Sequence, residues 1–555
     1  MGRVEAGGQN ISEREKRPDS HRVKTRLPRP ADLTTYSVIF DLSEREKKQS
    51  DAAHMKGHIP DAVVRLLEHA GENEVAEILQ KSERVVGIGS QSSLTGGATP
   101  AVERTVVLDM SLHKEILNLT DHFVTVQSGI SLHELNEVLG QKGLWYPPVP
   151  TFDGATVGGV INTNAAGANT FKYGQTRTWV EGLTAVLANG EILDIQRGQC
   201  IAHPPDATHA ASYFELEHPN GAIQTIPVPT YTMPDVSKIS AGYFAKPDMD
   251  LIDLFIGSEG TLGVITKATL RVIPKPLTSW ALIPCESQKQ ALALTKQLRD
   301  ASMQTWQSHD VQGIDISAIE YIDNHSLQLV REAGKKTPEG ANDVLIVQME
   351  MTPQQTEHAT DDLMQTFDTD APDVPITRFA NILSEHGLLE HGQLGIAMPK
   401  DVGLIEQFTA LREAVPEVVN KINGERHVQK IAGDFIVPFD HLEKLLDNLA
   451  SVFSYQNFEY AIWGHISDGN MHPNILVHSE QEARLAKAVM QNVGKNEVIL
   501  MGGSPLAEHG VGRNPVKQSF LGDLYGEEGV NQMRVVKKAL DPENKLAPGN
   551  LFAEK

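Results

Sequence analysis

The sequence predicts an α+β protein with at least two domains, and three observations support this fold class. A chain of 555 residues is too long for one hydrophobic core. Its content of 40% hydrophobic and 22% charged residues is typical of a globular protein. From about residue 60, short β-branched runs alternate with Gly-rich turns, and amphipathic helical segments follow further along. Strands that alternate with amphipathic helices favour an α+β domain whose sheet is covered on one side.

The first part of the chain carries strand and helix signals in close succession. Residues 1–50 are expected to form a flexible extension, because the first 30 or so are polar and unpatterned. The runs Thr105–Leu108 and Phe123–Val126 are typical of buried strands. Ser131 is followed by Glu134 at the spacing of a capping box, so a helix should begin there.

A domain boundary is predicted where an alternating strand, Leu262–Ile273, ends at Pro274 and Pro276. Beyond it the pattern is more helical, and Thr352 is a predicted N-cap with Pro353 at the first helical position. The sequence predicts a strand at residues 344–351 and helices at residues 288–303, 353–367, 404–415, 439–453 and 529–540.

Charge and cysteine content exclude several classes of protein. A formal net charge of -23 repels phosphate backbones, so no nucleic-acid partner is expected. Two distant cysteines, Cys200 and Cys285, exclude a disulfide framework, a cysteine-rich zinc module and an iron–sulfur cluster ligated within this chain. No secretory h-region and no apolar run of the roughly 18 residues that span a bilayer is found. We expect a cytoplasmic protein, and peripheral contact with the inner membrane stays open.

The most informative motif is GHISDGNMH at residues 464–472, which is followed by EHG at residues 508–510. Asp-Gly is a preferred centre of two-residue hairpin turns. If Asp468-Gly469 forms that turn, His465 and His472 lie directly opposite each other on two strands, on one face of the sheet.

Two imidazoles held in this way could bind one metal ion. Glu508 would complete a His₂Glu set and leave a coordination position open, as a catalytic metal requires. From the residues alone, this interpretation and a pair of solvated histidines are about equally favoured.

Three glycine-rich segments predict a bound ligand. The first, VVGIGSQSSLTGG at residues 85–97, is suited to hold an anion through backbone N–H groups, although it is neither G-x-G-x-x-G nor a Walker loop. The second, ATVGGVINTNAAG at residues 155–167, is dominated by small side chains that let a flat ligand approach the backbone. The third, GSEGTLGVIT at residues 257–266, leads into a strand. Three such segments fit a long nucleotide cofactor better than three independent turns.

Together these motifs resemble a known family. The glycine segments, with the prolines at 147–148 and the KYG of residues 172–174, resemble the vanillyl-alcohol-oxidase (PCMH) type of FAD-binding domain. The histidine motifs resemble the branch of FAD-linked D-2-hydroxyacid dehydrogenases that contains glycolate oxidase flavin subunits, D-lactate dehydrogenases and D-2-hydroxyglutarate dehydrogenases. The resemblance implies an FAD domain at 51–277 and an α+β cap domain with an antiparallel sheet and the metal site at 278–525. It also implies a C-terminal segment at 526–555 that returns to the FAD domain.

The resemblance also implies roles for single residues. His465, His472 and Glu508 would bind a divalent metal, usually zinc, and His509 would be the general base. Arg412 would grip the substrate carboxylate, and Lys430 is a weaker match to a second cationic contact. The residues expected to contact FAD are Gly87, Gly89, Ser90, Gln91, Ser92, Ser93, Leu94, Thr95, Gly96, Thr156, Gly158, Gly159, Asn162, Asn164, Gly167, Gly263, Val264, Ile265 and Asn474.

The implied activity is FAD-dependent oxidation of a D-2-hydroxy acid, such as D-lactate, glycolate or D-2-hydroxyglutarate, to the 2-oxo acid. The hydride would pass to flavin N5, a metal would lower the pKa of the alcohol, and His509 would take its proton. Electrons would leave to an external acceptor: a quinone, a cytochrome or an electron-transfer flavoprotein. A homodimer stays open, because members of the family are often dimers.

Three alternatives remain at this point. One is a non-redox flavoenzyme like alkyl-dihydroxyacetonephosphate synthase, or an oxidase that uses oxygen. A second is a flavin-free zinc hydrolase, and a third is a protein that keeps FAD only structurally. The chain also departs from the family pattern: Ser467 and Ala166 replace glycines, Ala547 and Asn550 replace the Asn and Lys of the tail motif, and the segment at about 197–238 is longer than the family core requires.

Overall fold

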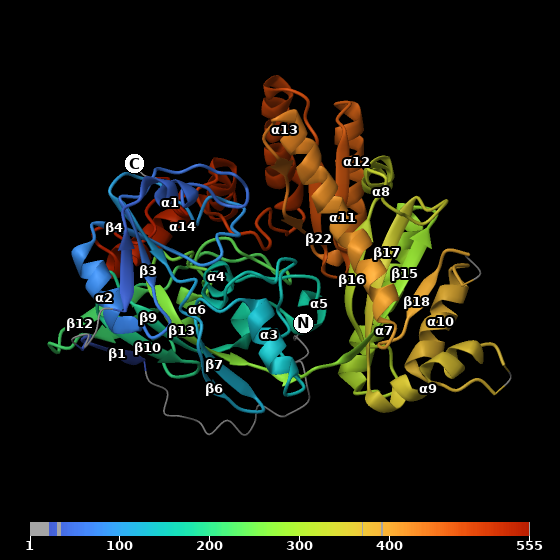
Figure 1. Cartoon of the computed structure of the whole chain (residues 1–555), viewed down its shortest axis with the longest axis horizontal. Helices are drawn as coiled ribbons and strands as arrows, with labels where there is room; N and C mark the ends of the chain where they lie inside the picture. Colours follow the sequence, from blue (N-terminus) through green and yellow to red (C-terminus); the bar gives the residue numbers. More distant parts are fainter. Residues whose placement is uncertain (1–20, 30–34, 369, 390–391, 554–555) are drawn as a thin grey trace.

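The computed structural model describes residues 21–29, 35–368, 370–389 and 392–553. Figure 1 shows two bodies side by side, an N-terminal domain in blue and green and a second domain in yellow and orange. The C-terminal helix α14, in red, lies with the N-terminal domain. Among the described residues, no helix combines the length and the apolar character needed to cross a bilayer.

The N-terminal domain contains two main sheets. The smaller one has the strand order β2 (Tyr36–Ile39), β3 (Ala62–Leu66), β5 (Thr105–Asp109) and β4 (Arg84–Ile88). Two of its pairings, β3 with β5 and β5 with β4, are parallel, whereas β2 is antiparallel to β3. The larger sheet has the order β12 (Ile223–Pro227), β11 (Tyr213–Glu217), β1 (Arg22–Arg26), β10 (Ile192–Gln196), β9 (Val180–Val186), β13 (Val264–Arg271), β7 (Phe123–Gln127) and β6 (Ile116–Leu119).

The N-terminal extension is only partly what the sequence predicts. Residues 1–20 and 30–34 lie outside the described residues, but β1, β2 and helix α1 (Leu42–Lys47) fall in the segment expected to be flexible. Strand β1 pairs with β10 on one side and β11 on the other, and its Val23 and Thr25 side chains are buried. Buried and exposed side chains alternate along β1, as in a half-buried strand. The sequence RVKTR contains a single apolar residue, so the alternation is hard to recognise from the sequence.

Short helices connect and cover these sheets: α2 (Glu72–Lys81), α3 (Leu132–Gly140), α4 (Val157–Thr163), α5 (Thr170–Tyr173) and α6 (Leu251–Phe255). The predicted capping box of α3 is confirmed, since Ser131 accepts from the backbone N–H of Glu134 and the Glu134 carboxylate accepts from that of Ser131. The long segment at 197–238 also finds an explanation here, because its β11 and β12 extend the larger sheet beyond β1.

The second domain is built on one antiparallel sheet. Its strand order is β18 (Gly395–Ala397), β15 (Leu277–Cys285), β17 (Asp343–Met351), β16 (Ile316–Ile322), β21 (Tyr460–His465), β22 (Asn470–Ile475) and β19 (Ile431–Ala432), with β20 (Phe435–Ile436) also paired to β22. Its helices are α7 (Gln288–Ser308), α8 (Asn324–Glu332), α9 (Pro353–Met364), α10 (Pro375–Glu385), α11 (Val402–Arg426), α12 (Leu442–Tyr455) and α13 (Glu480–Val493). The structure therefore confirms an α+β fold with an antiparallel sheet.

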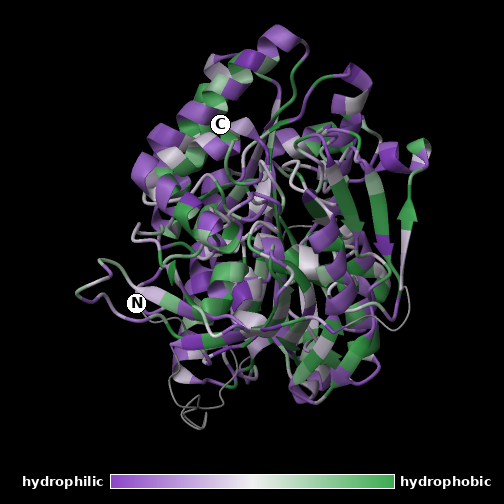
Figure 2. Cartoon of the chain, turned by 90° about the vertical axis from the view of Figure 1, so that its left-hand side faces the viewer, coloured by the Kyte–Doolittle hydropathy of each residue, from purple (hydrophilic) through white to green (hydrophobic). Residues whose placement is uncertain are grey.

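The expectation that helices cover one side of this sheet is wrong. Leu345 and Val347 of β17 pack in a core with α7, α10, α12 and α13. Val344 and Ile346 point the other way, into a core with α8 and α11. Strand β17 is therefore apolar on both faces. Figure 2, which has the N-terminal domain in front, shows that hydrophobic residues also run along several strands seen from that side. A strand such as DVLIVQMEM, which is nearly continuous in apolar residues, indicates burial on both faces.

Two helices are longer than their sequence signals predict. Helix α11 continues past Pro416 to Arg426, because Val418 and Val419 extend the buried face that packs against α8. Helix α14 (Pro515–Leu540) begins well before the expected residue 529, with a backbone kink at Gly526. In α11, burial of this apolar face outweighs the helix-breaking proline. In α14, Gly526 has non-helical angles (φ 68°, ψ 170°) and interrupts the helix, so the predicted helix at 529–540 is the second of its two pieces.

The C-terminal tail returns to the N-terminal domain. Val85 of β4 donates its N–H to the Lys545 carbonyl and accepts from the Ala547 N–H, both at 2.8 Å. Asn550 donates to the Gly97 carbonyl at 2.9 Å. The last part of the chain is thereby fixed beside the first glycine segment.

A buried polar cluster joins the two domains away from the tail. The ammonium of Lys172 on α5 lies 2.7 Å from Asp315 and 2.5 Å from Glu350 of the second domain. The Tyr173 hydroxyl also donates to Glu350, at 2.7 Å. The side chains of Lys172 and Glu350 are only 14% and 9% exposed to solvent. Their charges are therefore stabilised mainly by each other rather than by water.

We expect Lys172→Met to lower the free energy of unfolding by about 3 kcal/mol, because it leaves two carboxylates partly buried without their cation. Chemical denaturation monitored by tryptophan fluorescence measures the loss. Lys296→Met removes a pair in which the lysine side chain is 59% exposed, and should cost less than about 1 kcal/mol. Equal losses in the two variants would contradict a structural role for the domain junction.

Candidate active site

The three glycine segments line one cleft, of about 290 Å³, in the N-terminal domain; we call it the glycine cleft. The first segment begins within β4, the second contains α4, and the third leads into β13. The predicted cofactor residues that line it are Gly87, Gly89, Ser90, Gln91, Ser92, Ser93, Leu94, Thr156, Gly158, Gly159, Asn162, Gly263, Val264 and Ile265. The structure thus brings together segments that are nearly 200 residues apart in the sequence.

Two glycines in the lining of the glycine cleft allow neighbouring segments to pack closely. A Cβ atom at Gly89 would lie 2.1 Å from Oγ1 of Thr156, and one at Gly158 would lie 2.8 Å from Cβ of Ser128. At both positions a side chain of a neighbouring segment leaves no room for a Cβ atom, so only glycine lets these segments pack this closely.

Five predicted cofactor residues are outside the lining of the glycine cleft: Thr95, Gly96, Asn164, Gly167 and Asn474. Asn164 ends α4 in a left-handed conformation, and its side-chain amide donates to the Ile239 carbonyl. A Cβ at Gly167 would lie 2.2 Å from the Val149 carbonyl, so this glycine serves a close backbone contact. Asn474 is buried and donates to the carbonyl of His472. These three residues therefore contact the protein backbone rather than the interior of the cleft.

The hairpin of the histidine motif differs from the predicted two-residue turn. Residues 466–468 form a short 3₁₀ turn, and Gly469 closes the loop with a φ of 83°. The register therefore pairs His465 with Asn470 and Trp463 with His472. The two histidines are diagonal neighbours rather than direct partners. Because they keep the same strand parity, they still share one face, and their ring centroids are 5.4 Å apart.

Both histidines point at one carboxylate oxygen. Oε1 of Glu508 lies 3.5 Å from Nε2 of His465 and 3.3 Å from Nε2 of His472. Within the described part of the chain, the buried Nε2 of His465 has no hydrogen-bond partner. A buried imidazole nitrogen that faces a carboxylate and a second imidazole is suited to a metal ion.

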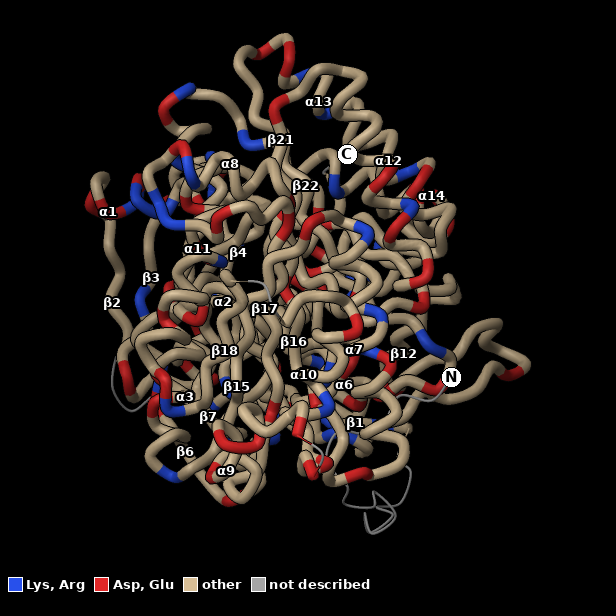
Figure 3. Tube along the Cα trace, turned by 90° about the vertical axis from the view of Figure 1, so that its right-hand side faces the viewer, with Lys and Arg blue, Asp and Glu red and all other residues tan. Residues whose placement is uncertain are grey.

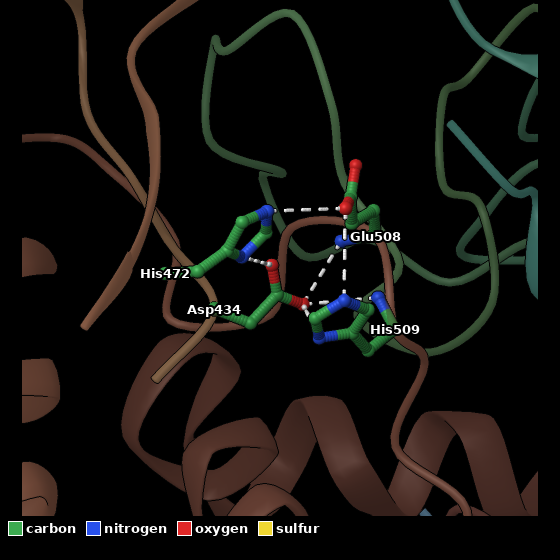
Figure 4. A group of neighbouring side chains, drawn as sticks. All are labelled: Asp434, His472, Glu508 and His509. Atoms are coloured by element: carbon green, nitrogen blue, oxygen red, sulfur yellow. Dashed lines mark hydrogen bonds and ion pairs between the residues drawn. The ribbon is translucent and has the colours of Figure 1, made fainter. Parts of the chain in front are cut away.

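Asp434 joins the same cluster. Four side chains each offer a possible ligand atom within 4.8 Å of the others: Asp434, His472, Glu508 and His509. Figure 4 shows Asp434 between the rings of His472 and His509. Its Oδ2 accepts the backbone N–H groups of Glu508 at 3.0 Å and His509 at 2.9 Å. Asp434 was missed as a site residue, and it fixes the loop that carries the predicted ligand and base.

Two further charged residues surround the histidines. Glu320 on β16 accepts from Nδ1 of His465 at 2.8 Å and from Arg412 at 3.2 Å. Burial would raise the pKa of Glu320, but Arg412 and His465 outweigh it and lower the pKa to about 2. Burial would lower the pKa of His465, but Glu320 raises it to about 9. A metal ion on His465 would therefore displace a proton.

Lys238 supplies a cation from the N-terminal domain. Its side chain is fully buried, and its ammonium lies 3.0 Å from Asp468 and 3.1 Å from Oε2 of Glu508. Burial opposes its charge, but these two carboxylates raise the pKa of Lys238 above its usual value. The pKa of Glu508 falls well below its usual range, since burial is outweighed by Lys238 and His465.

His509 is placed where a base would be needed. It lines the glycine cleft together with Glu508, and its Nδ1 lies 3.5 Å from Oδ2 of Asp434. Burial lowers the pKa of His509 to about 4, although Asp434 opposes this shift. At neutral pH the ring is therefore uncharged and can accept a proton.

The two predicted cationic substrate contacts have different positions. Arg412 on α11 connects the domains at the rim of the glycine cleft, because it donates to the Thr151 hydroxyl at 2.9 Å as well as to Glu320. Lys430 donates to Asn420 at 2.9 Å and lines a different cavity. The structure thus brings Arg412 to the cluster and leaves Lys430 apart from the glycine cleft.

Some of the missed residues carried a signal in the sequence. Glu320 is an acid inside the apolar strand ISAIEYI, and an isolated carboxylate in a buried strand requires a partner. Glu259 belongs to the third glycine segment, and its carboxylate accepts the N–H groups of Val511 and Gly512 at 2.7 Å. Lys238 lies in an irregular segment with no pattern that could single it out.

Comparison with known proteins identifies both domains. Residues 60–196 match the family of FAD binding domains, and residues 285–551 match the family described as FAD linked oxidases, C-terminal domain. The first match contains the first two glycine segments, and the second contains the histidine cluster; the third glycine segment, at residues 257–266, lies between the two matches. They confirm the predicted FAD-binding domain.

Three curated relatives illustrate the sequence similarity. Glycolate oxidase subunit GlcD of Bacillus subtilis is 27% identical over 515 residues, which cover 91% of each chain. D-lactate dehydrogenase of Anaerostipes hadrus is 27% identical over 497 residues, covering 88% of this chain and 89% of the relative. D-2-hydroxyglutarate dehydrogenase of Xanthomonas citri is 28% identical over 475 residues, covering 84% of each.

Solved structures share the fold. Two structures of alkyldihydroxyacetonephosphate synthase each align with a TM-score of 0.58 over 94% of this chain, covering 86% and 87% of theirs. Sequence identities of 15% and 17% limit this likeness to the fold.

The pair of Glu320 and His465 predicts a pH-dependent stability in protein stripped of metal ions. His465, whose pKa is raised, stabilises the fold fully below 6.5 and loses this contribution as the pH rises through about 9. Glu320, whose pKa is lowered, contributes above 4.5 and loses it as the pH falls through about 2. The pair is therefore most stabilising between pH 4.5 and 6.5.

We expect Glu320→Gln to lower the free energy of unfolding by about 3 kcal/mol near pH 5.5, with a smaller deficit above pH 9. Urea denaturation across this pH range measures the difference. Glu417→Gln, whose side chain is 65% exposed, is the control and should show a small deficit that does not depend on pH. A deficit of Glu320→Gln that stays constant from pH 5 to 10 would contradict the assigned charges.

Proposed function

Because the chain belongs to the FAD-linked oxidoreductase family, we propose that it oxidises a D-2-hydroxy acid to the 2-oxo acid. The curated relatives are named for glycolate, D-lactate and D-2-hydroxyglutarate, which share a hydroxyl group next to a carboxylate. The observation that supports this best is that Glu508 and His509 line the glycine cleft itself. The histidine cluster of the second domain and the cofactor cleft of the first are thus one site.

The residues present fit the two expected cofactors. The glycine cleft, whose lining includes the exposed Gly87 and Gly159, fits a long dinucleotide, and FAD would accept the hydride of the substrate. His465, His472 and Glu508, with the unpartnered Nε2 of His465 among the described residues, fit a divalent metal such as zinc. A metal there would act as a Lewis acid on the substrate hydroxyl.

The chain's own residues supply the remaining requirements. Neutral His509 accepts the hydroxyl proton, and Asp434 orients it through the backbone N–H and Nδ1 contacts. Arg412, at the rim of the cleft and 21% exposed, offers its guanidinium to the substrate carboxylate. Glu320 holds Arg412 and His465 in place. This arrangement orients the alcohol and removes its proton where the cofactor would lie.

The electrons must then leave the protein. Two buried cysteines, both unpaired, cannot hold an iron–sulfur cluster, so an external acceptor is required. One relative, from Arabidopsis thaliana, is named D-lactate dehydrogenase [cytochrome], which makes a cytochrome one candidate acceptor.

The proposed activity predicts that purified protein carries FAD and that its visible absorbance bleaches anaerobically with a D-2-hydroxy acid. His509→Asn should lower turnover with a dye acceptor by at least about 10²-fold, because the general base is lost. Stopped-flow absorbance measures the rate, and the flavin spectrum should persist in the variant.

A matched control is His478→Asn, in which the imidazole is 58% exposed on the surface. It should bleach at the rate of the unmodified protein. Unchanged bleaching in His509→Asn would remove this residue from the mechanism, and no bleaching with any D- or L-2-hydroxy acid would refute the proposed reaction.

The metal assignment predicts stoichiometric zinc or another divalent ion in the purified protein, with loss of activity after chelation. His472→Ala and Glu508→Gln should each lower the bound metal at least about 10-fold, as measured by atomic emission after dialysis. His69→Ala, at a side chain that is 80% exposed, serves as the control. Full metal content in both site variants would place the ion elsewhere.

A further inference from the structure

A second cavity lies at the junction of the two domains, at the edge of the second-domain sheet. Its volume is about 260 Å³, close to that of the glycine cleft. It is lined by residues 429–435, which contain β19 and the first residue of β20, by α13, by Pro505, by the start of α14 and by Met55 of the N-terminal domain. We call it the lysine cavity, after Lys430, Lys487 and Lys517 in its lining.

The charge of this cavity contrasts with that of the whole chain. The formal net charge is -23, and Figure 3 shows acidic residues spread over the side in view. Nevertheless, three lysines from separate segments line the lysine cavity. Among the described residues, Asp434 is the one carboxylate in this lining. The cavity therefore concentrates positive charge on an acidic protein.

None of the three ammonium groups is hydrogen-bonded to a carboxylate in the described part of the chain. Lys430 donates to the amide oxygen of Asn420, and Lys487 donates to that of Gln429. Nζ of Lys517 is buried without an acceptor. It lies 3.6 Å from Oδ2 of Asp434, beyond hydrogen-bond distance.

Asp434 cannot compensate for all this charge. Its Oδ2 already accepts two backbone N–H groups, from Glu508 and His509, and its Oδ1 accepts from Asn470 at 3.3 Å. A buried ammonium without an acceptor carries a desolvation cost that an anion would relieve. Beside a cavity, such a group has room for an acceptor that the described part of the chain does not supply.

We propose that the lysine cavity binds a small oxyanion, a phosphate or a carboxylate, with Lys517 and Lys487 as its principal ligands. The inference rests on the charge and the space of this cavity; its free-anion form is independent of the reaction proposed above, whereas its substrate form rests on that reaction. Asp434 separates the two sites, since it lies 3.6 Å from Nζ of Lys517 and 3.5 Å from Nδ1 of His509. The oxyanion is either a free anion or the second carboxylate of a dicarboxylic 2-hydroxy acid.

The test is calorimetric titration of the purified flavoprotein with inorganic phosphate in chloride buffer. We expect Lys517→Met and Lys487→Met each to weaken phosphate binding by at least about 10-fold, because each removes a charged hydrogen bond. Lys495→Met, at a side chain that is 58% exposed and paired with Asp523, should bind phosphate as the unmodified protein does. Circular dichroism of each variant verifies folding.

Steady-state kinetics distinguish the two sources of the oxyanion. If it is the substrate's second carboxylate, Lys517→Met raises the KM of D-2-hydroxyglutarate at least about 10-fold and leaves that of D-lactate unchanged. If it is a free anion, phosphate binds without competing with either acid. The proposal is overturned if Lys517→Met alters neither phosphate affinity nor the KM of D-2-hydroxyglutarate. The phosphate titration needs no turnover, so its failure is distinct from failure of the proposed oxidation.

Discussion

The charge balance around one buried carboxylate, Glu508, determines how the two domains meet. One oxygen of Glu508 faces the imidazoles of His465 and His472, and the other faces the ammonium of Lys238 from the N-terminal domain. Ionised groups at this depth persist only when each has partners of opposite charge. The position of the second-domain hairpin relative to the glycine cleft therefore depends on electrostatic contacts as well as on packing.

A surrounding layer of carboxylates keeps this centre in register. Asp434 fixes the backbone of the loop that carries Glu508 and His509, while Glu320 orients the opposite nitrogen of His465. Glu259 holds the following turn at Val511 and Gly512. Asp434 and Glu259 thus position the loop that carries Glu508 and His509, which has no regular helix or strand of its own, while Glu320 acts on β21. Rigid support of this kind is what orientation of a substrate requires.

Local features of the fold could be predicted from the sequence, whereas features that depend on distant contacts could not. The capping box of Ser131 and Glu134 acts within one turn of helix, so its spacing suffices. The glycine segments were recognisable because close backbone approach restricts residue size. The exact register of the hairpin could not be predicted, because it depends on a contact with a distant segment. A Cβ atom at Gly469 would lie 2.3 Å from the carbonyl oxygen of Val437. Lys238 also reaches the cluster from a segment that carries no pattern.

The tail that closes the glycine cleft has a consequence for biosynthesis. Asn550 lines the cleft, and residues 545–547 pair with β4, which is formed from residues 84–88. During translation, the N-terminal sheets can form several hundred residues before their last partner leaves the ribosome. Flavin capture by the nascent chain would therefore be incomplete, and the finished binding surface arises after the tail has emerged and docked.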